Sequence, residues 1–241
     1  MNKTFLFWCP FIGNVGTAKA VLESAKSFSN SDEYKCKIFN AFGEFDEYSA
    51  ELKKNRIEEI KLIKNRFIKK LPKEGFFWSR LTYILIFIFC FFPLLSYLNR
   101  NKNDSIFIYL ITSLPLLIIA LFDLKNKIIF RVSGRIRFTK LRKLIFLVSR
   151  KKIKKVLIQT LESKTRIIKE GIFDKKLICI VRDPIIDLKK INSLKYKKIE
   201  KKLLKKKYFV SIGRLTNQKN FLFLAKCIKN IVKEEKNFKF L

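Results

Sequence analysis

The chain has 241 residues, of which 49% are hydrophobic, and its 53 Lys and Arg against 20 Asp and Glu give a formal net charge of +33. This composition is typical of a globular protein, and the charge indicates anionic partners without choosing between nucleic acid, anionic lipid and phosphorylated small molecules. The absence of histidine excludes a histidine general base, a Ser-His-Asp triad and any His-ligated metal site.

The cysteines form neither a metal-binding nor a disulfide pattern. They are odd in number, far apart and mostly within apolar runs, and no pair has the spacing of a zinc site. Zinc-finger spacing and RNP-type aromatic motifs are also missing, so nucleic-acid binding rests on charge alone. We expect buried thiols in a reducing compartment at Cys9, Cys36, Cys90, Cys179 and Cys227.

The N-terminal segment predicts a strand, a glycine-containing loop and a helix. The strand is Thr4 to Cys9, the loop reads PFIGNVGT, and the helix runs from Thr17 to about Phe28. Gly13 and Gly16 would let the backbone approach a ligand closely, although an ordinary tight turn would look the same. The segment also imitates a secretory signal peptide, but Trp8 inside its apolar run argues against that interpretation.

A second strand is predicted at Tyr34 to Asn40, and a cluster of carboxylates follows it. Such a cluster could supply an acid and a base or bind a cation, but the pattern favours first-turn charges of a helix that starts near Asp46. Arg56 to Ile63 can be a third strand, and a helix from Tyr48 to Lys70 fits nearly as well. The carboxylates are Glu44, Asp46, Glu47 and Glu51.

Two uncharged apolar runs, at 81–98 and 106–122, suggest two transmembrane helices, so a small integral membrane protein is an alternative. The sequence TSLP divides the second run, because Ser113 can cap a helix that has proline in its first turn. We therefore expect a strand from Ile106 to Ile111 and a helix from Leu114 to Phe122, both too short to span a bilayer.

The first of these runs predicts one long apolar helix, from Trp78 to Leu98. It could be buried in the core, or its outer face could rest on a membrane with Trp78, Arg80 and Lys102 as anchors near the interface. Both interpretations of residues 78–98 stay open. The expected localisation is therefore cytoplasmic, with or without peripheral contact to the inner face of the cell membrane.

From Lys127 onward the sequence alternates strands and helices, which implies parallel βαβ units with right-handed crossovers. The predicted fold class is α/β, a Rossmann-like parallel sheet of about seven strands with flanking helices. Ser133 and Gly134 form a turn at a strand's carboxyl end, where ligands bind in such sheets, and a plain structural turn explains them at least as well. The predicted strands are Lys127 to Val132, Val156 to Gln159 and Lys176 to Val181, and the helices are Thr139 to Arg150 and Thr160 to Glu170, ending at Gly171.

Residues 187–207 are rich in Lys and predict a basic linker, with a tail for nucleic acid or anionic lipid as the alternative. The next segment, YFVSIGRLTNQKNFLFL, predicts strand Tyr208 to Ile212, a glycine turn, and a helix from about Gln218 to Glu235. Arg214 and Lys219 stand where loop amides and a helix N-terminus face an anion, and together they suit a diphosphate. The competing explanation is solvated surface, since cations are abundant in this chain.

The segment GRLTNQKN resembles the G-R-L-x-x-x-K-N segment that opens the second domain of family 4 (group 1) glycosyltransferases of the GT-B fold. YLITSLPLL, IIFRVSGRIRFTKLRK, QTLESKTRIIKEGIF and IVRDPII are similar to the course of that family's N-terminal domain. The resemblance implies that Arg214 and Lys219 bind the diphosphate of a nucleotide-sugar. It also implies that the glycines of PFIGNVGT and the turn at Ser133 and Gly134 face the cleft.

The resemblance implies a domain organisation as well. Residues 1–186 would be the acceptor-side domain, 187–207 the linker, and 208–241 the first strand and helix of the nucleotide-sugar-binding domain, with a further strand starting at Phe238. The family's Glu-x7-Glu motif would lie beyond Leu241, so we expect a fragment or the product of a truncated gene. The cleft histidine of many relatives has no counterpart here, which leaves the reacting centre undefined.

The expected function is transfer of a sugar from a nucleotide-sugar to an acceptor, with a membrane-linked glycan in cell-surface polysaccharide synthesis as the acceptor. By resemblance the reaction would be a hexosyl transfer that retains anomeric configuration, and catalysis would be mostly electrostatic. No side chain stands out as a nucleophile, and no cofactor or metal is expected. The expected partners are the donor, a glycan or lipid-linked acceptor and an anionic membrane surface. The alternatives are the integral membrane protein and a basic nucleic-acid-binding protein.

Overall fold

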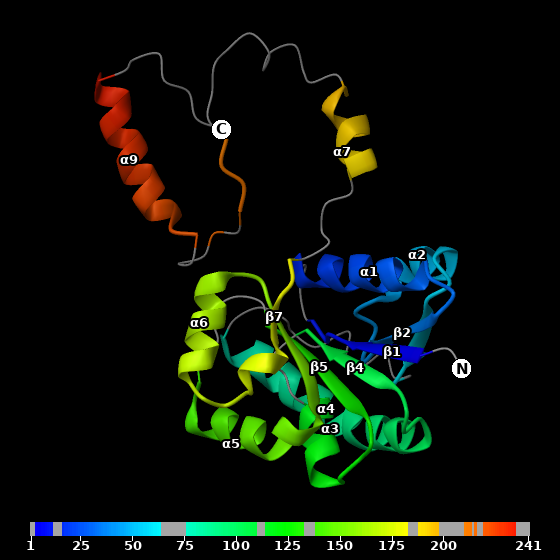
Figure 1. Cartoon of the computed structure of the whole chain (residues 1–241). Helices are drawn as coiled ribbons and strands as arrows, with labels where there is room; N and C mark the ends of the chain where they lie inside the picture. The colour runs from blue at the N-terminus through cyan, green and yellow to red at the C-terminus, as the bar shows by residue number, and fades with distance from the viewer. Residues whose placement is uncertain are drawn as a thin grey trace. The chain divides into compact units, whose positions relative to one another are not determined.

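The computed structural model describes residues 3–11, 16–63, 76–109, 114–132, 138–182, 188–197, 210–213, 215 and 219–234. The chain divides into two compact units, Met1–Ile185 and Ile186–Leu241 (Figure 1). The finer division into a linker at 187–207 and a domain opening at 208–241 stays a prediction.

The first unit is built on a seven-stranded sheet with the order β3-β2-β1-β4-β5-β6-β7, in which all neighbouring strands are parallel. This confirms the predicted α/β class with a Rossmann-like parallel sheet. The strands are short and rich in β-branched and aromatic residues, as buried parallel strands are. They are β1 Lys3–Trp8, β2 Tyr34–Asn40, β3 Glu58–Lys61, β4 Ser105–Ile108, β5 Lys127–Val132, β6 Ile153–Ile158 and β7 Ile178–Ile180.

Helices cover both faces of this sheet, and the direction of each crossover decides the face. α1 (Gly16–Ser29) and α2 (Ser49–Lys54) connect strands that progress toward β3, and their buried residues pack with those of β1, β2 and β4. The other connections lead to strands that lie toward β7. Because crossovers are right-handed, connections in this direction place their helices on the opposite face of the sheet. These helices are α3 (Phe76–Arg100), α4 (Leu114–Leu121), α5 (Lys140–Ser149) and α6 (Leu161–Lys169).

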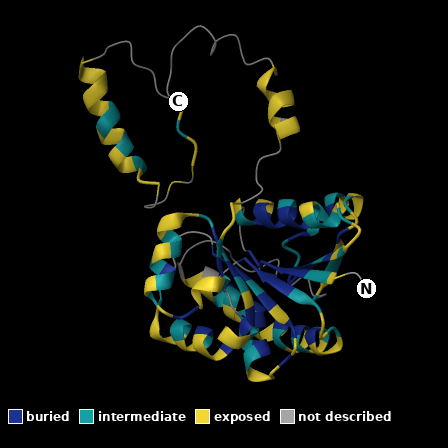
Figure 2. Ribbon diagram, in the orientation of Figure 1, coloured by how far each residue is buried: buried dark blue, intermediate teal, exposed yellow. Residues whose placement is uncertain are grey.

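Alternate residues of the central strands point into two separate cores. In β1, Leu6 and Trp8 face the α3 side, whereas Phe7 faces α1 and stacks on Phe107 of β4 with ring centres 5.0 Å apart. All three β1 residues are at most 1% exposed. Figure 2 shows the central strands buried between the helical layers. The strand ends on this sheet are therefore held rigidly from both sides.

α3 is the one described helix that is long and apolar enough to cross a membrane, with a mean hydropathy of 2.2 over Arg80–Arg100. It nevertheless packs on the sheet, because a stripe at four-residue spacing, Ile86, Cys90, Leu94 and Leu98, is at most 2% exposed and belongs to the core. The second run divides into the strand β4 and the helix α4, of four and eight residues, and this confirms the predicted division into a strand and a helix. The structure therefore does not favour two membrane spans.

Local sequence signals set several element ends. The hydroxyl of Thr160 accepts from the backbone N–H of Ser163 at 3.2 Å and caps α6, and Gly171 follows that helix with φ +66°, a conformation that suits glycine. α2 ends at Lys54, and Arg56 with φ +56° separates it from β3, so the alternative helix from Tyr48 to Lys70 is wrong. The predicted cap Ser113 lies outside the described residues.

The second unit contains α7 (Leu188–Lys195) and α9 (Phe221–Glu234). The predicted strand Tyr208 to Ile212 is wrong over its described part, since residues 210–213 are irregular and Ile212 is 91% exposed. A strand needs a partner for its backbone groups, and the described part of this unit contains no other strand. The strand predicted from Phe238 lies outside the described residues.

Candidate functional site

The strand order reverses between β1 and β4, and this defines the candidate site. β1 continues to β2 and β3 on one side, whereas β4 continues to β5, β6 and β7 on the other. In open α/β sheets, ligands bind beyond the carboxyl ends of the strands at such a switch point. The backbone N–H of Tyr109, directly after β4, donates to the carbonyl of Trp8 at 3.1 Å, so the two strand ends are joined there.

A buried arginine lies at this edge of the sheet. Arg131, near the end of β5, is 2% exposed, which is uncommon for a charged side chain. Its Nη1 donates to the carbonyl of Val181, after β7, at 3.4 Å, and its guanidinium carbon lies 5.7 Å from the ring centre of Tyr109. These contacts fix a positive charge beside the switch point. Arg131 was not predicted as a site residue, although a lone cation inside the apolar strand KIIFRV could have indicated it.

The loop after β2 holds a carboxyl group whose pKa is raised. The two carboxylate oxygens of Glu44 accept from the backbone N–H groups of Ala41 and Phe42, each at 2.9 Å. Burial raises the pKa of Glu44 to about 7, although these hydrogen bonds lower it. Burial and, to a smaller extent, the charge of Glu44 raise the pKa of the Cys9 thiol at the end of β1. Glu44 can therefore exchange a proton near neutral pH at the candidate site.

Glu44 gives the folded protein a measurable pH dependence. Its pKa of about 7 lies above the ordinary value of 4.5, so the folded state binds the proton more tightly than the unfolded chain. We expect this group to lower the free energy of unfolding by up to roughly 3 kcal/mol as the pH rises through that interval. Urea unfolding across the interval measures the slope, and Glu44→Gln should flatten it. The exposed neighbour Glu47→Gln is the control, and an equal slope in both variants would contradict the assignment.

The other carboxylates of the predicted cluster have structural roles. Asp46 and Glu47 lie in the first turn of the 3-10 helix η1 (Asp46–Tyr48), and Glu51 lies in the first turn of α2. Glu51 also forms an ion pair with Lys26 of α1. The predicted first-turn positions are confirmed for these three carboxylates, and Glu44 is the one whose inward position the sequence did not indicate.

Asn40, the last residue of β2, organises the same loop and is 1% exposed. Its amide group donates to the carboxylates of Asp46, at 2.8 Å, and of Glu59 in β3. Its carbonyl oxygen accepts from the backbone N–H groups of Gly43, at 2.7 Å, and Phe45, at 3.4 Å. One buried side chain therefore joins the loop to the neighbouring strand and fixes the loop's path.

The residues predicted for the cleft loops are only partly within the described structure. Gly16 is the first residue of α1, and a Cβ added to it would meet no atom within 4 Å. This open space leaves room for a ligand, and the binding role of Gly16 stays a prediction. Gly13, Ser133, Gly134 and Arg214 lie outside the described residues.

In the second unit, Lys219 lies two residues before the start of α9, a helix of 14 residues. A Cβ added to Gly213 would lie 3.5 Å from Cγ of Lys219 and 3.4 Å from the ring of Phe221, so Gly213 lies beside the helix start. Asn220 has φ +49°, and its carbonyl accepts from the N–H of Leu224 at 3.2 Å. An exposed lysine beside a helix N-terminus favours an anion.

Among the residues that the structure describes, no group of three or more Cys, Asp or Glu side chains is arranged to hold a metal ion. The absence of a metal cofactor stays a prediction. The five cysteines are free thiols, and Cys9, Cys36 and Cys90 are buried as expected, whereas Cys179 and Cys227 are partly exposed.

Solved structures similar to this chain have the GT-B fold. The Anabaena protein HepE, in complex with UDP, is 14% identical, with all of this chain and 69% of that chain covered and a TM-score of 0.55. A glycosyltransferase from Rickettsia africae is 14% identical, with coverage of 100% and 68% and a TM-score of 0.57. A UDP-N-acetylglucosamine 2-epimerase from Rickettsia bellii is 12% identical, with coverage of 100% and 62% and a TM-score of 0.56.

At these identities the similarity establishes the fold alone: the chain has the GT-B type of α/β architecture. No protein-family model matches the chain, and no curated protein matches it. Proteins of this fold include sugar-transferring and sugar-epimerising enzymes, so the reaction has to be argued from the site.

Proposed function

We propose that this protein is a glycosyltransferase that uses a nucleotide-sugar donor and belongs to family 4 of the GT-B glycosyltransferases. The observation that carries the proposal is Lys219 beside Gly213 at the start of α9, within the segment GRLTNQKN, in a chain with the GT-B fold. The similarity to a UDP-bound structure supports the donor class, since a nucleotide diphosphate needs such a cationic helix start.

In the proposed reaction, Arg214, Lys219 and the amides at the start of α9 bind the donor diphosphate. As the bond from the sugar to the diphosphate breaks, negative charge develops on the leaving oxygen, and these groups stabilise it. The reaction is proposed to retain the anomeric configuration. No resident cofactor or metal is needed in this scheme, because cationic side chains supply the charge.

The acceptor is proposed to bind at the carboxyl edge of the sheet in the first unit. The loops there carry Gly13, Gly16, Ser133 and Gly134 as the proposed cleft residues, and Gly16 has open space beside it. Arg131 contributes a fixed positive charge at the same edge. We propose a membrane-linked glycan as the acceptor and a cytoplasmic location for the reaction.

Nucleotide binding tests the donor site. We expect UDP, ADP or GDP to bind in calorimetry, and Lys219→Gln to weaken the binding about tenfold or more, since a charge-assisted contact to phosphate is lost. Lys226→Gln is the matched control, because it removes an exposed lysine from the same helix away from its start. Equal binding by both variants would overturn the assignment of Lys219.

Product analysis separates transfer from epimerisation, the activity of a similar solved structure. Incubation with radiolabelled UDP-sugars and a membrane extract should move label into the lipid or glycan fraction. Conversion of the free nucleotide-sugar into its epimer, without transfer, would reject the glycosyltransferase in favour of an epimerase.

A further inference from the structure

The outward side of the helical layer formed by α3, α4 and α5 is apolar. On α3, the exposed residues repeat at four-residue spacing opposite the buried stripe, with Ile84 55%, Ile88 60% and Phe92 74% exposed. α5 has a similar exposed row, formed by Leu141, Leu144 and Val148. We call this surface the apolar face, and it includes Ile84, Ile88, Phe92, Phe122, Leu144 and Val148.

The apolar face continues from one helix to the next. The ring of Phe91 on α3 lies 6.1 Å from that of Phe122, directly after α4, and Phe122 is 48% exposed. α4 and α5 in turn pack with the same core, so their outward sides point away from the same face of the sheet. Exposed apolar patches of this kind mark surfaces that bind other molecules or membranes.

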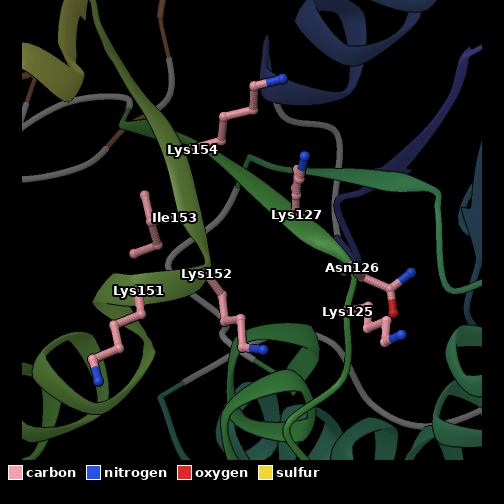
Figure 3. A pocket seen from close by; sticks show the side chains of 7 residues that line it. All are labelled: Lys125, Asn126, Lys127, Lys151, Lys152, Ile153 and Lys154. Carbon is pink, nitrogen blue, oxygen red and sulfur yellow. The ribbon is translucent and has the colours of Figure 1, made fainter.

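Lysines gather at the starts of β5 and β6, and Figure 3 shows Lys125, Lys151 and Lys152 on the side of α4 and α5, whereas Lys127 and Lys154 point to the other side of the sheet. A pocket of about 250 Å³ lies where α4 leads into β5 and α5 leads into β6 (Figure 3). Its lining contains five lysines and no carboxylate, and Asp123, outside the lining, forms an ion pair with one of them, Lys152, at 2.8 Å. The lining residues are Lys125, Asn126, Lys127, Lys151, Lys152, Ile153 and Lys154.

We propose that the apolar face docks on an anionic lipid bilayer, with α3 lying in the plane of the interface and Lys125, Lys151 and Lys152 binding lipid phosphates at its edge. An apolar helix surface beside a cluster of cations is the pattern of interfacial membrane binding. Trp78, which is 47% exposed near the start of α3, is a residue type that prefers the membrane–water interface. Membrane docking of this face does not depend on glycosyl transfer.

Charge and burial favour the bilayer over other occupants. A second copy of this chain would bring its own lysines to the interface, and the two groups of positive charges would repel each other. A spanning orientation of α3 would remove Leu94 and Leu98, both 0% exposed, from the core of the sheet. If α3 instead lies in the plane of the membrane interface, Leu94 and Leu98 stay buried against the sheet. The lipid then covers the exposed residues on the opposite side of the helix.

Vesicle flotation with the full chain tests the proposal. We expect the protein to float with vesicles of phosphatidylcholine and phosphatidylglycerol, to remain unbound with phosphatidylcholine alone, and to be released by carbonate. The double variant Ile88→Asp/Phe92→Asp should lose binding, and Lys125→Gln/Lys151→Gln should weaken it roughly tenfold or more.

Matched controls distinguish docking from general effects. Leu161→Asp changes an exposed leucine at the start of α6, where a carboxylate suits the helix dipole, and Lys53→Gln/Lys54→Gln removes two lysines from α2 on the opposite face of the sheet. Both should bind as the wild type does. Circular dichroism checks that the variants fold. Equal loss in the controls, no flotation of the wild type, or a dimer that Ile88→Asp/Phe92→Asp dissociates would each overturn the proposal.

Discussion

Leu94→Ala is expected to lower the free energy of unfolding by about 2–5 kcal/mol, because it leaves a cavity between α3 and the sheet. Leu94 is 0% exposed and belongs to the core that also contains Trp8 and Ile108. Phe92→Ala, two residues away on the same helix, removes a larger side chain that is 74% exposed. Its effect should stay within about 0.5 kcal/mol in detergent-free buffer. Urea unfolding followed by circular dichroism measures both changes.

The comparison tests the position of α3 rather than its helicity. Both substitutions introduce alanine, the best helix former, so intrinsic propensity cannot produce the difference. A large effect of Phe92→Ala, or a negligible effect of Leu94→Ala, would show that the buried and exposed stripes are assigned to the wrong sides.

Asn40→Asp is expected to cost about 3–5 kcal/mol at neutral pH. The substitution removes the amide donor from Asp46 and Glu59 and places a third carboxylate between them, in a site that is 1% exposed. Repulsion among the three carboxylates raises their pKa values, so the lost stability should partly return as the pH falls and protons bind. Thermal unfolding at neutral and mildly acidic pH measures both the loss and its recovery.

Asn103→Asp is the matched control for this substitution, since it makes the same chemical change at an exposed turn before β4. It should alter the free energy of unfolding by less than about 0.5 kcal/mol. A loss at Asn40→Asp that does not depend on pH would contradict the charge argument and indicate a purely steric effect.

The sequence predicted the sheet well because each of its signals is local. Runs such as FLFW, IFN and KIIFRV are bounded by polar turns, and threonine caps and Gly171 mark helix ends that hydrogen bonds and backbone angles confirm. The start of β6 was placed three residues late, because Lys154 and Lys155 conceal a strand that already begins at the buried Ile153. A lysine-rich strand loses its apolar signal when one of its faces is only partly covered.

The candidate site was less predictable, since it depends on contacts between distant segments. Glu44 resembles its acidic neighbours in sequence, and only the fold brings its carboxyl group near Cys9, after β1, and Cys90, in the middle of α3. The position of Arg131 in the site likewise depends on its contacts with Tyr109 and Val181, which follow other strands of the sheet. Lys219 was found from the pattern GRLTNQKN, and its binding role stays a prediction.

The pairing of β1 with β4 also governs how this chain can fold. Phe5 is the partner of Ser105, 100 residues further along, so the centre of the sheet cannot close until α3 and β4 have left the ribosome. Contacts of such long sequence separation slow folding, and until they form, one edge of β1 and the apolar stripes of α3 stay open to association with other chains. A nascent chain of this topology therefore exposes these surfaces throughout the synthesis of the segment between β1 and β4.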